Sequence, residues 1–293
     1  MTSRRSFLKS GTKFSAGLLL APAEFYRMQT LIGLQLYTVR ELMEQNPADT
    51  LAKVAKVGFN SVEGATYTEI QKFYGMDTKV FAGLLKDNGL IMPSCHYRLG
   101  EEKTNGENVK GTMLHEWDKA VDDAASVGLK YMVCAFLSPS ERGGLDHYKY
   151  VTDQLNIAGE KCKKAGIQLC YHNHDFEFIK QDNAYPMDIL LGADKELVKF
   201  EMDLYWVKKA GIDPIELFDQ HPGRFPLMHL KDMDKTEKRA FTEVGNGIID
   251  FKTILNHKKK AGLKYFFVEQ DKCPGSPIDS IIQSYNYIKK NLV

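Results

Sequence analysis

The stretch Lys164-Ala165-Gly166-Ile167-Gln168-Leu169-Cys170-Tyr171 decides the fold of this chain. It joins the end of a helix-like stretch to an apolar strand through one glycine. Glycine suits this position because the residue after a helix usually adopts a left-handed conformation that a Cβ atom disfavours. The apolar run behind it is typical of a strand that is buried on both faces, as in a parallel sheet. We therefore expect helix and parallel strand to alternate here.

The same junction recurs along the chain, with further glycines at positions 58, 89, 128 and 262. Three apolar runs without the glycine, and one short run after Gly58, have the same strand character. The eight predicted strands are 31–36, 61–63, 90–92, 131–134, 167–171, 198–202, 226–230 and 265–268. The helical periods between and after them cover 49–57, 80–88, 115–127, 148–165, 186–191, 215–218, 251–261 and 278–290.

This alternation predicts one α/β domain, a single (β/α)8 TIM barrel over residues 24–293. The alternative is a doubly wound open sheet. That fold commonly opens with a glycine-rich phosphate loop, and none follows the first predicted strand. The longest predicted loops, 99–110 and 231–250, follow strands and so belong to the face where barrels carry their chemistry.

The first 23 residues have the layout of a secretory signal. Arg4 and Arg5 precede a short apolar run at 16–20 and a small-x-small cleavage site at 21–23. The paired arginines predict export through the twin-arginine pathway to the periplasm and removal of residues 1–23. The apolar run is shorter than the roughly 20 residues that span a bilayer, so we expect no stable membrane anchor. A disordered basic N-terminus is the alternative.

Composition and charge exclude several classes of protein. With 43% hydrophobic and 26% charged residues the chain is an ordinary globular protein. Loss of the four positive charges in residues 1–23 would change the net charge from +1 to −3, which argues against a nucleic-acid partner. The five cysteines are scattered without a Cys-x-x-Cys pair, and we expect buried free thiols. A homo-oligomer is compatible with the sequence.

Four predicted strands in succession end in residues that suit one metal ion. These are His172, Asp203, His229 and Glu269. Because the carboxyl ends of parallel barrel strands meet at one mouth, we expect the four side chains to converge there. A mixed set of nitrogen and oxygen ligands suits Mn²⁺, Zn²⁺, Co²⁺, Fe²⁺ or Ni²⁺ better than Ca²⁺. The alternative for each residue alone is a hydrogen-bonded loop residue.

The segment from Tyr171 to Glu177 is dense in metal ligands and proton carriers. His172 and His174 lie two apart and so share a strand face, and either one could bind the metal while the other acts as acid or base. The alternative is a polar loop whose histidines cap the backbone.

These pieces resemble the xylose isomerase-like TIM barrel superfamily of sugar phosphate isomerases and epimerases. The resemblance covers nearly all of residues 30–293 and rests on the segments 33–40, 171–178, 203–206, 229–232, 245–251 and 268–269. It implies that Asp203, His229 and Glu269 bind an Mn²⁺-like ion. The fourth family ligand is usually a glutamate, where this chain has His172. The family's two-glutamate proton transfer therefore cannot be assumed, and His174, Glu177 or Lys231 is left for that step beside Glu269. The endonucleases of the superfamily that cut at abasic sites carry a histidine where this chain has Trp206, so their extra metal ligands are missing.

We expect a metal-dependent isomerase or epimerase for a free or oxidised sugar or a glycoside, because phosphorylated sugars are scarce outside the cytoplasm. Polarisation of a sugar carbonyl would acidify the adjacent C–H bond and stabilise an enediolate. The residues expected to contact substrate are Gln35, Tyr37, Glu63, His96 and Trp206, with Phe136 as a further apolar wall. Two alternatives remain: a lyase that eliminates the aglycone of a 3-keto-glycoside, and a noncatalytic exported sugar-binding barrel.

Overall fold

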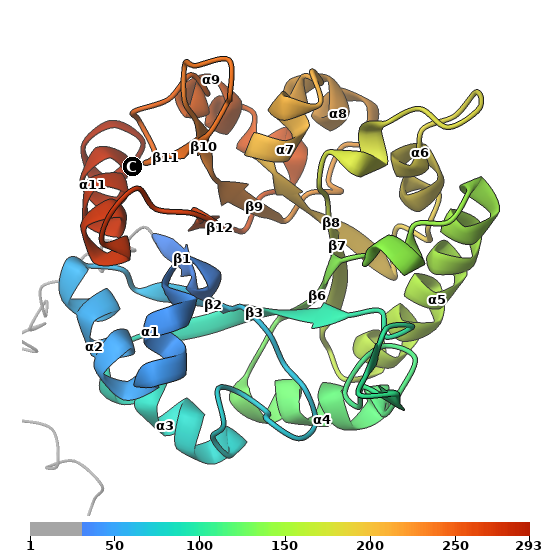
Figure 1. Ribbon diagram of the computed structural model, residues 1–293, viewed down its shortest axis with the longest axis horizontal. Coiled ribbons are helices and arrows are strands. Elements are labelled where there is room, and N and C mark those ends of the chain that lie inside the picture. Colours follow the sequence, from blue (N-terminus) through green and yellow to red (C-terminus); the bar gives the residue numbers. More distant parts are fainter. Residues whose placement is uncertain (1–30) are drawn as a thin grey trace, which may run out of the picture. The chain divides into compact units, whose positions relative to one another are not determined.

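Eight parallel strands close into a barrel in the part of the chain that this computed structural model describes, residues 31–293 (Figure 1). They are β1 (Gly33–Gln35), β2 (Ser61–Gly64), β3 (Ile91–Arg98), β6 (Tyr131–Phe136), β7 (Gln168–His172), β8 (Val198–Asp203), β9 (Leu227–Leu230) and β12 (Tyr265–Val268). They follow this order around the barrel, and β12 pairs in parallel with β1. The prediction of a (β/α)8 barrel is confirmed, and the open sheet is excluded.

Helices surround the strands on all sides (Figure 1). They are α1 (Arg40–Gln45), α2 (Pro47–Val57), α3 (Thr78–Asp87), α4 (Trp117–Val127), α5 (Leu145–Lys164), α6 (Pro186–Leu191), α7 (Leu204–Lys209), α8 (Pro214–Gln220), α9 (Phe251–Asn256), α10 (Lys258–Ala261) and α11 (Pro277–Asn291). The junction glycines have left-handed backbone as expected, with φ of 91° at Gly128 and 74° at Gly166. The fold therefore shows the alternation of helices and strands that the sequence predicts.

The barrel interior is apolar at one level and polar above it. Val133, Cys170, Leu227 and Phe267 form a small buried cluster of inward-facing side chains. Residues two further along the same strands, such as His172 and His229, lie toward the carboxyl ends of the strands, because inward positions recur every second residue. The apolar cluster thus forms a floor, and the space above it is free for polar chemistry.

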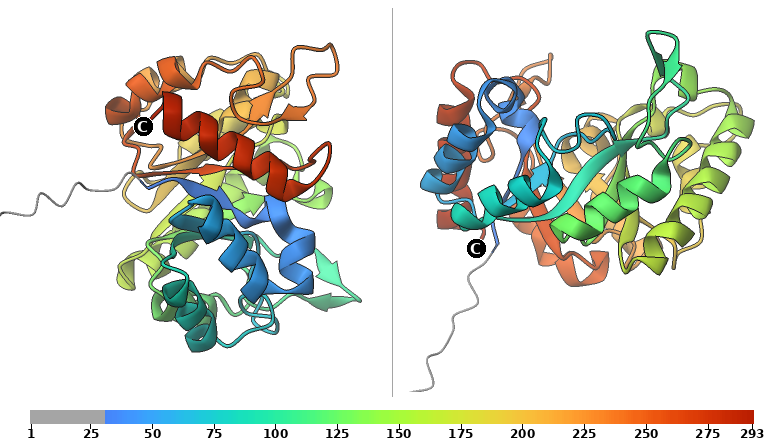
Figure 2. Two further views of the ribbon diagram at one scale, coloured as in Figure 1. Left: turned by 90° about the vertical axis from the view of Figure 1, so that its left-hand side faces the viewer. Right: turned by 90° about the horizontal axis from the view of Figure 1, so that it is seen from below.

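Both long predicted loops contain small hairpins. The first holds β4 (Lys103–Thr104) and β5 (Glu107–Asn108), and the second holds β10 (Asp232–Met233) and β11 (Phe241–Thr242). Figure 2 shows the β4–β5 hairpin projecting from the barrel. These loops therefore build walls on the mouth of the barrel.

The five cysteines are free thiols, and four of them are buried, as predicted. Between residues 31 and 293 there is no helix of the length and apolar character needed to cross a membrane. The predicted signal at 1–23 and the first residues of the predicted barrel domain lie outside the described residues.

Candidate metal centre

The four residues predicted from the strand ends come together at the mouth of the barrel. His172 ends β7, Asp203 ends β8, His229 lies in β9, and Glu269 follows β12. Asp203 and His229 are direct partners across β8 and β9, so the sheet register itself brings them together. All four are at most 5% exposed, and one ligand atom from each lies within 4.8 Å of the others. We call these four residues the upper centre.

The distances in the upper centre fit a single ion. His172 Nε2 lies 3.1 Å from His229 Nδ1 and 3.4 Å from Asp203 Oδ2, and His229 Nδ1 lies 2.8 Å from Glu269 Oε2. Ligand bonds of about 2.1 Å would separate neighbouring donor atoms by about 3.0 Å in an octahedron and about 3.4 Å in a tetrahedron. The residues present therefore suit a divalent metal ion.

The backbone leaves the right oxygen of Asp203 for that ion. Its Oδ1 caps α7 by accepting the N–H groups of Tyr205 and Trp206, at 2.9 and 3.2 Å. Its Oδ2 is buried and faces His172 Nε2 at 3.4 Å and the Lys231 ammonium at 2.9 Å. Glu269 Oε2 likewise faces His229 Nδ1 and the same ammonium. A divalent ion would bind these two oxygens in competition with the ammonium.

Lys231 supplies a positive charge beside the upper centre. Its Nζ lies 2.9 Å from Asp203 Oδ2, 2.7 Å from Glu269 Oε2 and 2.8 Å from Asp271 Oδ1, and the side chain is 2% exposed. Burial alone would lower the pKa of Lys231, but the three carboxylates outweigh burial and hold that pKa well above its usual value. Asp271 was not predicted from the sequence, although it lies two residues after Glu269.

Beneath His229 lies a second group, which we call the lower cluster: Glu63, His96 and Glu201. His229 Nε2 lies 2.6 Å from Glu63 Oε2 and 3.3 Å from Glu201 Oε2. Sequence reasoning missed Glu201 because it sits inside an apolar strand run. Its position two residues before Asp203 on β8 is the signal that could have placed it inside the barrel.

The structure places two predicted substrate contacts away from the pocket. Gln35 and Glu63 are fully buried, and neither lines the cavity. The Gln35 amide donates to Glu63 Oε2 at 2.8 Å, and its Oε1 accepts the N–H of Tyr37. Both side chains therefore belong to the buried network of the lower cluster and not to the cavity wall.

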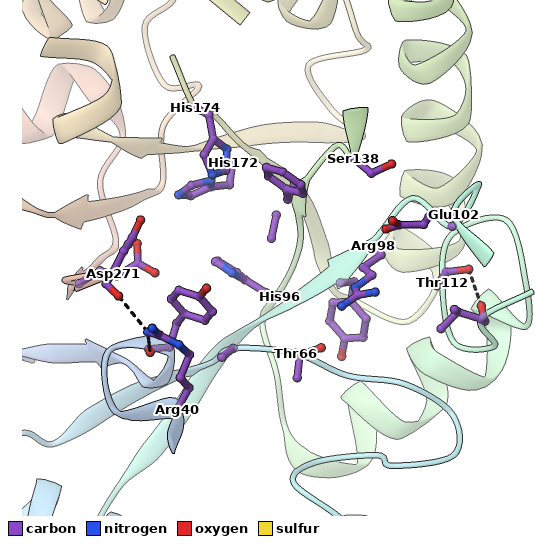
Figure 3. Close-up of a pocket in the computed structure, with 18 of the residues that line it drawn as sticks. Arg40, Thr66, His96, Arg98, Glu102, Thr112, Ser138, His172, His174 and Asp271 are labelled. Carbon is purple, nitrogen blue, oxygen red and sulfur yellow. Dashed lines mark hydrogen bonds between the residues drawn. The ribbon is translucent and has the colours of Figure 1, made fainter. Parts of the chain in front are cut away.

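The remaining predicted contacts line a cavity of about 950 Å³ above the upper centre (Figure 3). Tyr37, His96 and Trp206 belong to its wall, together with Phe136. In Figure 3, His172, His174 and Asp271 lie on one side of the cavity, Arg98, Thr112 and Ser138 lie on the other, and His96 lies between them. Tyr37 and Phe136 are 41% and 43% exposed, which gives the cavity two open aromatic surfaces.

Two proton carriers predicted on the loop after β7 have different surroundings. His174 lines the cavity and packs its ring against those of Phe176 and Trp206, at centroid distances of 5.4 and 5.3 Å. Burial and the neighbouring His172 and Lys231 keep the pKa of His174 well below its usual value, so its imidazole is neutral. A neutral imidazole at the cavity wall can accept a proton.

Glu177 does not line the cavity. Its carboxylate accepts the Tyr171 hydroxyl at 2.7 Å and the His174 backbone N–H at 2.8 Å. Burial raises the pKa of Glu177 to about 7. The structure thus gives Glu177 contacts that position the His174 loop, and no contact with the cavity where it was expected to transfer protons.

The match to a family model decides the relationship of this chain. The model for the xylose isomerase-like TIM barrel matches residues 51–290. The chain belongs to this family. The match agrees with the family resemblance inferred from the sequence segments quoted above.

Three proteins that are similar to this chain share between 15% and 28% sequence identity with it. An inosose dehydratase of Lacticaseibacillus casei is 24% identical over 78% of this chain and 86% of its own length. A sugar phosphate isomerase/epimerase structure from Parabacteroides distasonis is 28% identical, with a TM-score of 0.75 over 89% of this chain and 94% of that one. A crystal structure of the IolI protein with a bound zinc atom is 15% identical, with a TM-score of 0.69 over 89% of this chain and 97% of that one.

Proposed function

We propose that this chain is a metal-dependent, sugar-modifying enzyme that removes a proton next to a carbonyl group, and that it isomerises or epimerises a free or oxidised sugar or a glycoside. The observation that carries the proposal is the upper centre, buried at the base of a cavity of about 950 Å³ beside the neutral imidazole of His174. A cavity of this size has room for a sugar with a substituent.

The residues have separate roles in this proposal. His172, Asp203, His229 and Glu269 would hold the ion, with Mn²⁺ as the first choice and Zn²⁺ next, since the IolI protein carries zinc. When bound, the ion supplies Lewis-acid polarisation of the substrate carbonyl. His174 accepts the proton from the adjacent carbon, and the Lys231 ammonium stabilises negative charge that develops on the substrate oxygen.

The fate of the proton then decides the product. Return to the neighbouring carbon gives an isomer, and return from the opposite face gives an epimer. Loss of a group from the next carbon gives elimination. Elimination is the second candidate function, because dehydratases remove water and an inosose dehydratase aligns with 78% of this chain. A 3-keto-glycoside lyase would follow the same route with an alcohol as the leaving group.

A proton-exchange assay tests the proposal. Protein loaded with Mn²⁺ is incubated in D₂O with free sugars, keto-sugars and keto-glycosides, and products are followed by NMR. We expect deuterium at the carbon next to the carbonyl, with epimer or isomer for the leading proposal and an unsaturated product for elimination. Binding of a sugar without exchange across the whole panel would instead support the noncatalytic binding barrel.

A matched variant separates specific chemistry from background exchange. Asp203→Asn keeps the oxygen that caps α7 and removes the charge that the ion needs. We expect it to fold and to lose exchange. Equal exchange in the variant and the wild type would contradict the assignment of the upper centre.

A further inference from the structure

The lower cluster has the composition of a metal site in its own right. His96 Nε2 lies 2.9 Å from Glu201 Oε2 and 3.4 Å from Glu63 Oε2. The two carboxylates are fully buried, and His96 is 8% exposed. One imidazole nitrogen and two carboxylate oxygens thus meet at the spacing that neighbouring ligands of one ion adopt, about 3.0 to 3.4 Å for bonds near 2.1 Å.

Each carboxylate of the lower cluster has an oxygen with no donor. Glu63 Oε1 and Glu201 Oε1 are buried and accept no hydrogen bond. Ion pairing to the imidazoles involves the other oxygen of each group, Oε2. An ion at the cluster could satisfy both free oxygens, because the two oxygens of a carboxylate can bind one ion together.

The charge of the whole buried centre points the same way. The buried Glu63, Glu201, Asp203 and Glu269, together with Asp271, whose side chain is 23% exposed, carry five negative charges against one ammonium, that of Lys231. With neutral imidazoles the charge is −4, and a divalent ion at the upper centre reduces it to −2. A second divalent ion brings it to zero. Buried charge is costly unless it is compensated, so a neutral centre is the stable arrangement.

We propose that Glu63, His96 and Glu201 bind a second divalent transition-metal ion beneath the upper centre. His229 lies between the two ions: its Nδ1 faces the upper ion, and its Nε2–H donates to the Glu63 carboxylate. His96 lines the cavity, which gives the ion a route from solvent. The charge argument rests on the proposed ion of the upper centre, whereas the geometry of the lower cluster does not.

Metal stoichiometry tests this directly. The full chain is stripped with a chelator, titrated with Zn²⁺ or Mn²⁺ and analysed for bound metal after gel filtration. We expect about two equivalents in the wild type and about one in Glu201→Gln, which keeps shape and removes one ligand charge. Asp203→Asn should also retain about one equivalent, held by the lower cluster. Glu141→Gln, a buried glutamate on another loop, is the matched control and should retain two.

Each outcome decides between the two sites. One equivalent in the wild type that survives in Glu201→Gln and disappears in Asp203→Asn overturns the second ion and leaves the proposed function standing. No bound metal in the wild type overturns both. If Glu201→Gln fails to fold, His96→Gln replaces it, with circular dichroism as the check, and retention of two equivalents by that variant overturns the proposal.

Discussion

The ring of His229 joins the upper centre to the lower cluster. Its two ring nitrogens face different groups, Nδ1 toward Glu269 at 2.8 Å and Nε2 toward Glu63 at 2.6 Å. A histidine that binds a metal through one nitrogen usually donates its other N–H to a carboxylate, which fixes the ring and its tautomer. The contact between Glu63 and His229 therefore links the lower cluster to the upper centre.

We expect the charge of Asp203 to be needed for metal binding at the upper centre but not for folding. Asp203→Asn retains the Oδ1 position that caps α7, and it removes the anionic Oδ2 beside His172. We expect proton exchange to fall by about 100-fold or more, since a lost ligand should cost at least as much as a lost support residue. The rise in melting temperature on adding Mn²⁺ should become smaller, because only the lower cluster still binds an ion, as measured by differential scanning fluorimetry. An unchanged rise would refute this role.

Lys231 and an ion should compete for the same oxygens. The ammonium lies 2.9 Å from Asp203 Oδ2 and 2.7 Å from Glu269 Oε2, the atoms that face the imidazoles. Removing one partner of a buried ion pair costs about 3 to 5 kcal/mol. We therefore expect Lys231→Met to melt earlier than the wild type without metal, and to gain more stability than the wild type on adding Mn²⁺. Isothermal titration should show tighter metal binding.

The control for Lys231→Met is Lys209→Met. Lys209 pairs with Asp175 at 3.1 Å on a partly exposed surface. Exposed ion pairs contribute little, so its metal affinity should match that of the wild type. Weaker metal binding in Lys231→Met than in this control would count against competition.

Glu177 should make the barrel less stable as pH rises. Its pKa is raised from 4.5 to about 7, so between these values the folded chain keeps a proton that the unfolded chain has lost. Stability therefore falls with pH across this window, by about 3 kcal/mol at most from this group, and is constant above it. Glu177→Gln cannot ionise. Denaturant unfolding should show it close to the wild type at pH 5 and more stable at pH 8, and a gap that does not change with pH would refute this account.

At the scale of elements, one buried carboxylate joins two loops of the cavity wall. Glu141 ends η2 (Pro139–Glu141), and its Oε1 accepts the backbone N–H groups of Gly100 and Glu101 while Oε2 accepts that of Ser138. A buried donor left without its acceptor costs about 1 to 3 kcal/mol. We expect Glu141→Ala to lower the melting temperature and to speed proteolytic cleavage of the loop 99–112.

Glu141→Gln should show a smaller effect, because its remaining oxygen can still accept from part of this set. Limited proteolysis followed by mass spectrometry locates the cut. Cleavage of Glu141→Ala at the wild-type rate would mean that Glu141 does not hold this loop.

The strands of the barrel and most of its helices could be predicted from the sequence, and several short elements could not. All eight strands lie where the glycine junctions and apolar runs indicate, and the predicted helix 186–191 agrees with α6. The β4–β5 and β10–β11 hairpins were predicted only as loops, because two-residue strands carry no measurable periodicity. Helix α7 was not predicted. Its N-cap, Asp203, was interpreted only as a metal ligand, and not as the start of a helix.

The candidate site could likewise be predicted only in part. Strand ends identify the upper centre because all eight ends share one mouth. The lower cluster requires knowledge of which side chains point inward below that mouth. Glu63 and His96 were expected to contact substrate. His96 does line the cavity, and its ring also lies between Glu63 and Glu201, whereas Glu63 does not reach the cavity.

At the scale of the whole molecule, the ligands connect distant parts of the chain. Glu63 on β2 and Glu269 after β12 both contact His229, and β12 closes the barrel onto β1. An ion at this point binds only the closed barrel, because the unfolded chain does not present the set together. Metal loading and folding are therefore expected to be coupled.

This coupling matters for the predicted export. Twin-arginine signals belong to proteins that cross the membrane folded, so the barrel would acquire its ion in the cytoplasm. We predict that the full chain, expressed in a bacterium with this pathway, appears in the periplasmic fraction shortened by 23 residues. Replacing Arg4 and Arg5 by lysine should leave the precursor in the cytoplasm, with its metal bound, because the signal and not the barrel is changed. Immunoblots of fractionated cells and mass spectrometry of the mature N-terminus measure both results. Equal export of the lysine variant would show that another route carries this protein, and an uncut periplasmic chain would show that the segment 21–23 is not the cleavage site.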